Sequence, residues 1–217
     1  MDRFAFMPTH ENTGRTAAVE ALPDPPRIAW RKEMRERVMD AAHELTCADG
    51  WDKTSLSAVA ARAQVSRPSV YKEFGTRARL GHALVTRETR RLLDDITEAL
   101  GTADGNPRDA LETALLLVLT VADRNPLLRS VVTAARPGVD SLLPYLAART
   151  DPLFDGAHGL LRAWLDERFP TRAEEDLDVV SDFVVRTAMS HLVLPTWPPE
   201  VAAGRLSRTA FRVLGEP

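Results

Sequence analysis

The chain has 217 residues, of which 44% are hydrophobic and 27% charged, so it can bury a core of its own as an ordinary globular protein. Its net charge of −3 is uneven: residues 27–81 carry 11 basic and 7 acidic side chains, whereas the segments on both sides are acidic. A single cysteine, Cys47, excludes an internal disulfide framework. The absence of a long apolar run leads us to expect a cytoplasmic protein without a signal peptide or membrane partner.

The N-terminal segment, residues 1–26, mixes Pro, Thr, Glu and Gly without periodicity, which predicts a flexible arm. From Arg27 onward, apolar side chains recur at intervals of about one helical turn, and Gly50 ends this run. We therefore predict a first helix between Arg27 and Gly50, with an apolar face formed by Trp30, Met34, Val38, Ala42 and Leu45.

Two short helices are predicted next. Thr54 is positioned to cap the first, and Ser66 to cap the second after a break at residues 63–65. Gly75 ends the second helix, and Thr76 can cap a long helix that extends to Gly101.

The two short helices have the pattern of a helix-turn-helix. Ala60 supplies the small residue needed where two steeply crossing helices meet. The apolar residues of a miniature core stand at suitable offsets: Leu56, Val59, Val65, Val70 and Phe74. The outward face of the second helix carries donors that can reach bases or phosphates, namely Arg67, Ser69, Tyr71 and Lys72.

Helix starts around this motif are also expected to bind anions, because unpaired N–H groups and the helix dipole attract negative charge. Thr54, Ser55, Ser66 and Thr76 lie at such starts. Arg77 stands where the dipole disfavours a cation, so a nearby phosphate would explain its placement, although a solvated surface position is the alternative.

The remainder of the chain is predicted to be helical, and no segment alternates with the period of a strand. Asn106-Pro107 reads as a helix start, and further helices are expected over 125–132, near 142–146, from 152 to about 170, over 172–194 and over 199–214. The expected fold is all-α, with a flexible arm (1–26), a helix-turn-helix domain (27–75) and a helical body (76–217).

The segments 56–60, 65–75 and 76–77 resemble the signature of TetR-family regulators, and the spacing matches without gaps. This resemblance implies that the first three helices bind DNA, that the third is the recognition helix, and that the body binds a ligand and dimerises. It also implies phosphate contacts by Tyr71 and Arg77, and places Ser66 and Arg67 at the start of the recognition helix.

Two residues depart from the family pattern. Gln64 stands where the turn usually has Gly, which predicts a strained or altered turn. Glu73 stands where His or Tyr is commoner, and an acid near DNA would repel phosphate or accept from a cytosine amino group.

Other candidate sites are weaker. We find no catalytic motif, no metal-binding pair among the five histidines and no cofactor motif, so we expect neither an enzyme nor a cofactor. Cys47 is interpreted as a packing residue, with redox sensing as the alternative. Aromatic and polar residues of the body are either core or pocket walls, and the candidate ligand contacts are Phe154, His158, Trp164, Phe183 and Arg186; for Arg186 we favour an internal acid as the partner.

The favoured function is a homodimeric repressor that binds a palindromic DNA operator and is released by a small apolar or amphipathic effector. The last two helices are expected to pair the subunits, with Val184, His191, Leu206 and Phe211 as candidate interface residues. Two alternatives remain: an activator or architectural protein with the same domain, and a helical partner-binding module that does not bind DNA.

Overall fold

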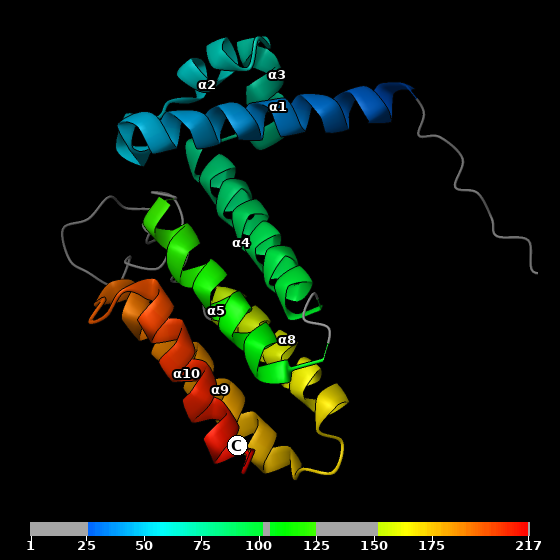
Figure 1. Cartoon of the computed structure of the whole chain (residues 1–217). Coiled ribbons are helices and arrows are strands. Elements are labelled where there is room, and N and C mark those ends of the chain that lie inside the picture. Colours follow the sequence, from blue (N-terminus) through cyan, green and yellow to red (C-terminus); the bar gives the residue numbers. More distant parts are fainter. Residues whose placement is uncertain (1–25, 102–104, 125–151, 217) are drawn as a thin grey trace, which may run out of the picture.

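The computed structural model describes residues 26–101, 105–124 and 152–216, and within these ranges the chain is helical without strands (Figure 1). The predicted arm up to residue 25 and the helices predicted over 125–132 and near 142–146 lie outside the described residues. The described elements are α1 (Pro26–Asp49), η1 (Trp51–Lys53), α2 (Leu56–Arg62), α3 (Arg67–Phe74), α4 (Arg77–Gly101), α5 (Pro107–Arg124), α8 (Pro152–Arg168), α9 (Glu174–Val193) and α10 (Pro199–Val213).

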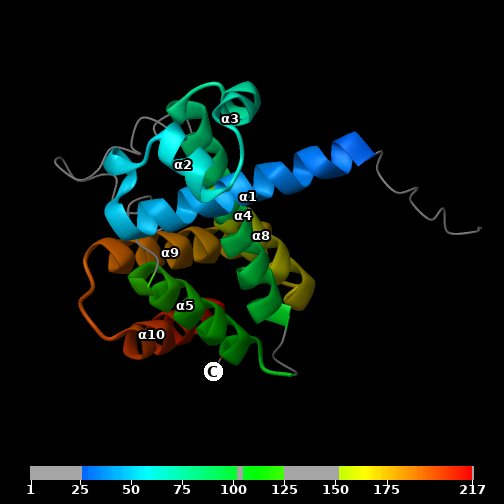
Figure 2. The ribbon, with the colours of Figure 1, turned by 90° about the horizontal axis from the view of Figure 1, so that it is seen from above.

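The helices form two groups that share α4. In Figure 1, α1, α2 and α3 gather around the N-terminal end of α4, and α5, α8, α9 and α10 lie along its C-terminal half. Figure 2 shows the same division from above, with α2 and α3 on the far side of α1 from the body helices. One long helix therefore connects the two parts of the molecule.

Each group has its own core. In the N-terminal group, Val38, Val59 and Val70 have no exposed surface, and Leu80 and Leu84 of α4 complete this core. In the body, α5, α8, α9 and α10 bury a larger cluster in which Leu165, Leu177 and Val180 are fully enclosed. Burial of each such side chain contributes about 1.5–3 kcal/mol relative to exposure, so helix packing is the main source of stability here.

The predicted helix caps are confirmed with one exception. Ser66 accepts a hydrogen bond from the N–H of Ser69 at 3.2 Å, and Thr76 accepts one from the N–H of Arg79 at 3.2 Å. Thr54 was predicted to cap α2, but Ser55 does so, accepting from the N–H of Ala58 at 3.1 Å. The extra 3-10 turn η1 shifts the cap by one residue and leaves the Thr54 hydroxyl donating to the carbonyl of Gly50 at 3.1 Å.

The expectation that Trp30 belongs to the buried face of α1 is wrong. Met34, Val38 and Ala42 are buried as predicted, but the Trp30 side chain is 57% exposed. The reason is visible in Figure 1: the first turns of α1 project beyond α3 and α4, so that no body helix covers them.

Candidate nucleic-acid interface

The helix-turn-helix core assembles as the apolar spacing predicts. Leu56, Val59, Val70 and Phe74 are buried, Ala60 lies at the helix crossing with 1% of its surface exposed, and Val65 packs against them from the turn. This core holds α2 and α3 in a fixed relation and turns the polar face of α3 outward.

The turn between α2 and α3 requires a left-handed residue. Gln64 has a φ of 54°, the strained conformation expected from a side chain where the family usually has glycine. Arg37 of α1 stabilises this turn, because its Nη2 donates to the carbonyls of Ala63 at 2.7 Å and Gln64 at 3.2 Å. The sequence analysis missed Arg37, since no local pattern indicates a partner 26 residues away.

Most of the candidate DNA-contacting residues share one surface. Ser55, Ser66, Arg67, Lys72 and Thr76 are exposed, Ser69 is partly exposed, and Tyr71 is 52% exposed despite its size. An exposed tyrosine flanked by hydroxyls and two cations presents several donors to a polyanion. Thr54 does not belong to this surface, because only 3% of it is exposed.

Arg77 has partners within the chain, which differs from the expectation that a phosphate explains its placement. Its Nη2 donates to the carbonyl oxygen of Trp51, and its guanidinium lies over the Trp51 ring with 4.8 Å to the centroid. The same nitrogen is 3.6 Å from the Asp52 carboxylate. These contacts compensate the unfavourable helix dipole and bind the start of α4 to η1.

Glu73 also differs from its expected position near DNA. Its carboxylate faces α1, accepting from Arg31 Nε at 2.7 Å and from Arg35 Nη1 at 2.9 Å, and only 8% of its side chain is exposed. Burial by itself raises the pKa of the Glu73 carboxyl, but the hydrogen bonds and charges of Arg31 and Arg35 outweigh burial and lower this pKa below its usual value. The acid therefore joins α3 to α1 and is largely withdrawn from the outward face of α3.

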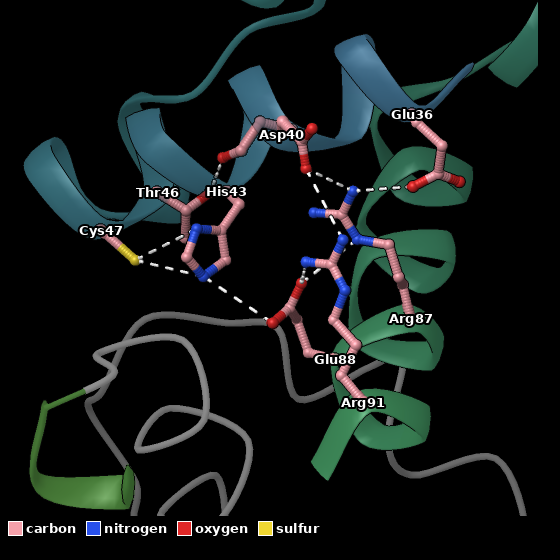
Figure 3. A network of polar contacts seen from close by, with 9 residues as sticks. Glu36, Asp40, His43, Thr46, Cys47, Arg87, Glu88 and Arg91 are labelled. Carbon is pink, nitrogen blue, oxygen red and sulfur yellow. Dashed lines mark hydrogen bonds and ion pairs between the residues drawn. The ribbon is translucent and has the colours of Figure 1, made fainter. Parts of the chain in front are cut away.

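A polar network joins α1 to the middle of α4 (Figure 3). Arg87 is buried and donates from Nη1 to Asp40 at 2.8 Å and Glu36 at 3.3 Å, and from Nε to Glu88 at 3.2 Å. Arg91 donates to Glu88 at 3.3 Å. The network therefore lies between the helix-turn-helix and the body, where it couples the position of α1 to that of α4.

The network also includes Cys47 and His43. The Cys47 sulfur lies 3.7 Å from His43 Nε2, and this nitrogen is 3.8 Å from the Glu88 carboxylate (Figure 3). Cys47 also packs against the N-terminal core as a partly buried side chain, in agreement with its interpretation as a packing residue.

An apolar cavity of about 80 Å³ lies between α4, α5, α8 and α9. All of its lining side chains are aliphatic or methionine, without a hydroxyl, amide or charge: Leu92, Ile96, Leu100, Leu111, Ala114, Leu115, Val118, Leu153, Ala157, Leu161, Val184, Val185, Ala188, Met189 and Leu192. The α4 residues of this wall follow directly on the part of α4 that contacts the helix-turn-helix core.

None of the five candidate ligand contacts lines this cavity, so their expected position is wrong. Phe154 stacks on His158, and Arg186 lies over the Phe154 ring, which places these three at the surface of α8 and α9. Trp164 donates to the carbonyl of Leu100 at 3.2 Å, and Phe183 packs against the body core. The apolar faces of these helices point inward, and the aromatic residues lie at the borders of those faces.

The partner of Arg186 is the acid Asp182, one turn earlier on α9. Its Nε donates to the two carboxylate oxygens at 2.7 and 2.8 Å, and the Arg186 side chain is 65% exposed. An acid of the chain is therefore confirmed as the partner, but the pair lies at the surface and not in the interior.

Three of the four candidate interface residues are also wrong. Val184, Leu206 and Phe211 are 2%, 5% and 5% exposed, because they pack within the body core of this chain. His191 is partly exposed and lies 5.2 Å from the exposed Trp197 ring. The exposed large apolar side chains of α9, α10 and their connection are instead Val179, Leu194, Trp197, Val201 and Val213.

Within the described ranges no group of three His, Cys, Asp or Glu side chains could hold a metal ion. Over the same ranges no helix has the length and apolarity needed to cross a bilayer.

Comparison with known proteins places both halves of the chain in the same group of proteins. Residues 38–84 match the family described as bacterial regulatory proteins, tetR family, and residues 106–212 match the C-terminal domain of the bacterial tetracycline repressor. The transcriptional regulator AlkX of Mycobacterium tuberculosis is 28% identical over 181 residues, which cover 83% of this chain and 84% of the relative. The transcriptional repressor KstR of Rhodococcus jostii is 26% identical over 189 residues, covering 86% and 85%.

A solved structure agrees with these matches. The TetR-family repressor AlkX from a Dietzia strain, implicated in the biodegradation of n-alkanes, superposes with a TM-score of 0.63 and 26% identity. The superposition covers 82% of this chain and 96% of the other. The similarity therefore extends over the helix-turn-helix and the body together.

Proposed function

Because this chain belongs to the TetR family of bacterial transcriptional regulators, we propose that it is a dimeric repressor whose hold on a palindromic operator is weakened by an apolar effector. The observation that carries the proposal is the double role of α4. Leu80 and Leu84 belong to the helix-turn-helix core, whereas Leu92, Ile96 and Leu100 line the body cavity.

DNA binding is assigned to α3 and the helix starts beside it. Ser55, Ser66, Arg67, Ser69, Tyr71, Lys72 and Thr76 form the proposed contact surface, with Arg77 fixing the start of α4 behind it. One helix-turn-helix reads a half-site, and a two-fold dimer places two recognition helices about 34 Å apart, in successive major grooves. A TetR-family dimer would thus read an inverted repeat.

Effector binding is assigned to the aliphatic cavity. Its volume of about 80 Å³ is smaller than the roughly 300–1,000 Å³ of typical ligand pockets, so an occupant has to be slender or has to separate the helices. A wall without hydrogen-bonding side chains favours an unbranched hydrocarbon or acyl chain. The link between a related repressor and n-alkane biodegradation supports the same class of compound.

The coupling follows from the geometry of α4. A chain that enters between α4, α5, α8 and α9 prefers a conformation with α4 displaced, and the Arg87 network transmits this displacement to α1. A coupling free energy of about 1–3 kcal/mol would lower DNA affinity roughly 5- to 150-fold.

Selection of bound sequences from random duplexes tests the DNA-binding half of the proposal. We expect an inverted repeat, with an affinity that falls steeply as salt rises and that drops on Tyr71→Ala, while Tyr71→Phe distinguishes the hydroxyl from the ring. Recovery of no consensus, or an affinity insensitive to salt and to Tyr71→Ala, would contradict DNA binding and favour a partner-binding module.

A second experiment tests the effector. Dodecane and dodecanoic acid, added to the selected complex, should release DNA and raise the thermal stability of the free protein, by about 2.7 kcal/mol at one hundred times Kd. Ala188→Val narrows the cavity from α9 and should reduce release without changing DNA affinity in the absence of effector. Equal release from both proteins would contradict the assignment of this cavity.

A further inference from the structure

The N-terminal end of α1 projects beyond α3 and α4, away from α5 and α10, as Figure 1 and Figure 2 both show. The segment from Pro26 to Met34 has a rise of about 13 Å along the helix axis. It contains Arg27, Arg31 and Lys32 against a single acid, Glu33. A helix end of this charge lies beside the recognition helix and takes no part in the core.

One face of this segment forms a groove with α3. Arg27, Trp30, Arg31 and Met34 follow the spacing i, i+3, i+4, i+7, which places them on a single stripe of α1. Together with three residues of α3, this stripe lines a groove of about 510 Å³, the α3 wall being Ser69, Lys72 and Glu73.

The charges in the groove are unequally paired. Glu73 is held by Arg31 and Arg35 at 2.7 and 2.9 Å, so its negative charge is compensated from α1. Among the residues that the structure describes, no ion pair links Arg27 or Lys72 to an acid. The groove therefore has an excess of positive charge, and the exposed Trp30 indole lies along its edge.

We propose that this groove binds the DNA backbone just outside the half-site read by α3. The proposal rests on the DNA-binding function proposed above and extends its contact surface from α3 to α1. Ser69 and Lys72 belong to both surfaces, so a backbone leaving the outward face of α3 meets Arg27 and Trp30 next. Guanidinium, ammonium and indole N–H groups are donors without an acceptor, which suits phosphate oxygens.

The reach of the segment sets the expected footprint. About 13 Å of helix corresponds to roughly four base pairs at about 3.4 Å each. The Glu73 bridges to Arg31 and Arg35 hold the segment against α3, so its position is determined before DNA is bound.

The experiment compares two duplexes that contain the selected inverted repeat, one trimmed to the two half-sites and one with five further base pairs at each end. The full chain should bind the longer duplex about tenfold more tightly. The double variant Arg27→Ala/Trp30→Ala should lose this advantage and lower the salt slope by about two, one phosphate per protomer, while binding the trimmed duplex as the unchanged protein does. Arg90→Ala, an exposed arginine of α4 outside the groove, is the matched control and should keep the advantage.

Equal affinity of the unchanged protein for both duplexes, or an undiminished advantage in the double variant, would overturn the proposal and leave DNA binding by α3 intact. Failure to select any duplex would overturn both proposals. Binding of the trimmed duplex shows that the double variant is folded, so a loss confined to the longer duplex is not a folding defect.

Discussion

At the scale of single residues, the two departures from the family pattern have different outcomes. Gln64 adopts the left-handed conformation that its position in the turn predicts, whereas Glu73 faces α1 and not the outward surface. A backbone conformation is imposed by the immediate neighbours in sequence. A side-chain direction depends on which distant residues offer it a partner, here Arg31 and Arg35.

Replacing the strained residue should stabilise the protein. A left-handed conformation costs an ordinary L-residue about 1–2 kcal/mol, and glycine avoids this cost while gaining freedom in the unfolded chain. We expect Gln64→Gly to raise the free energy of unfolding by about 0.5–1 kcal/mol in urea denaturation. Gln64→Val should lower it, since a branched side chain resists positive φ; the reverse order would contradict strain at this turn.

Neutralising Glu73 should loosen the contact of α3 with α1. We expect Glu73→Gln to lower the free energy of unfolding by about 1 kcal/mol at pH 7, because two charge-assisted hydrogen bonds become weaker. Glu44→Gln, which removes a pair between two exposed groups on the opposite side of the motif, is the control and should cost less.

The pH dependence of this difference has a definite sign. Since the pKa of Glu73 is lowered in the folded protein, its contribution is present above the ordinary glutamate value of about 4.3 and is lost as the pH falls through the lowered pKa. The two proteins should therefore converge in stability below that ordinary value. A difference that stayed constant on acidification would contradict the ion pair.

At the scale of elements, α4 is positioned by two different kinds of contact. Its start is held by η1, where Arg77 covers the Trp51 ring, and its middle by the Arg87 network with α1. Gly81 permits the first contact, because a Cβ at this position would lie 2.7 Å from Trp51 Cζ2. Small changes in α4 therefore reach the helix-turn-helix through packed surfaces.

A methyl group at Gly81 should disturb this junction. We expect Gly81→Ala to destabilise the protein by about 1–3 kcal/mol, since the buried Trp51 ring cannot move freely. Gly159→Ala in α8 meets nothing within 4 Å and should stabilise by up to about 1 kcal/mol, as alanine favours a helix over glycine. Thermal unfolding of both variants provides the measurement, and a stable Gly81→Ala would contradict the close packing.

At the scale of the whole molecule, the exposed apolar residues of the last two helices support pairing of two chains there. Trp197 is 39% exposed between His191 and Arg205, and Val201 is 40% exposed one turn into α10. Isolated apolar residues are common on surfaces, but a group of them around one helix connection is typical of an interface. The residues that form the core of this chain are unavailable for that role.

An acid in this group should separate the subunits. We expect Val201→Asp to reduce the mass in light scattering from two chains to one, and to weaken binding to the full inverted repeat more than to a single half-site. Ile28→Asp, an equally exposed apolar residue on α1, should leave the mass unchanged. An unaltered dimer in Val201→Asp would place the interface elsewhere.

The sequence by itself determined the all-α class, the helix-turn-helix with its core, most helix boundaries and the strained turn at Gln64. These features depend on spacings within about twenty residues, where caps, a small crossing residue and helical periodicity act locally. Only the tertiary structure decided that Arg77 folds back on Trp51, that Glu73 faces Arg31, and that Val184 belongs to the cavity wall. Each of these depends on which faces of helices distant in the chain come together, and side chains of similar chemistry occur on several faces of the same helix.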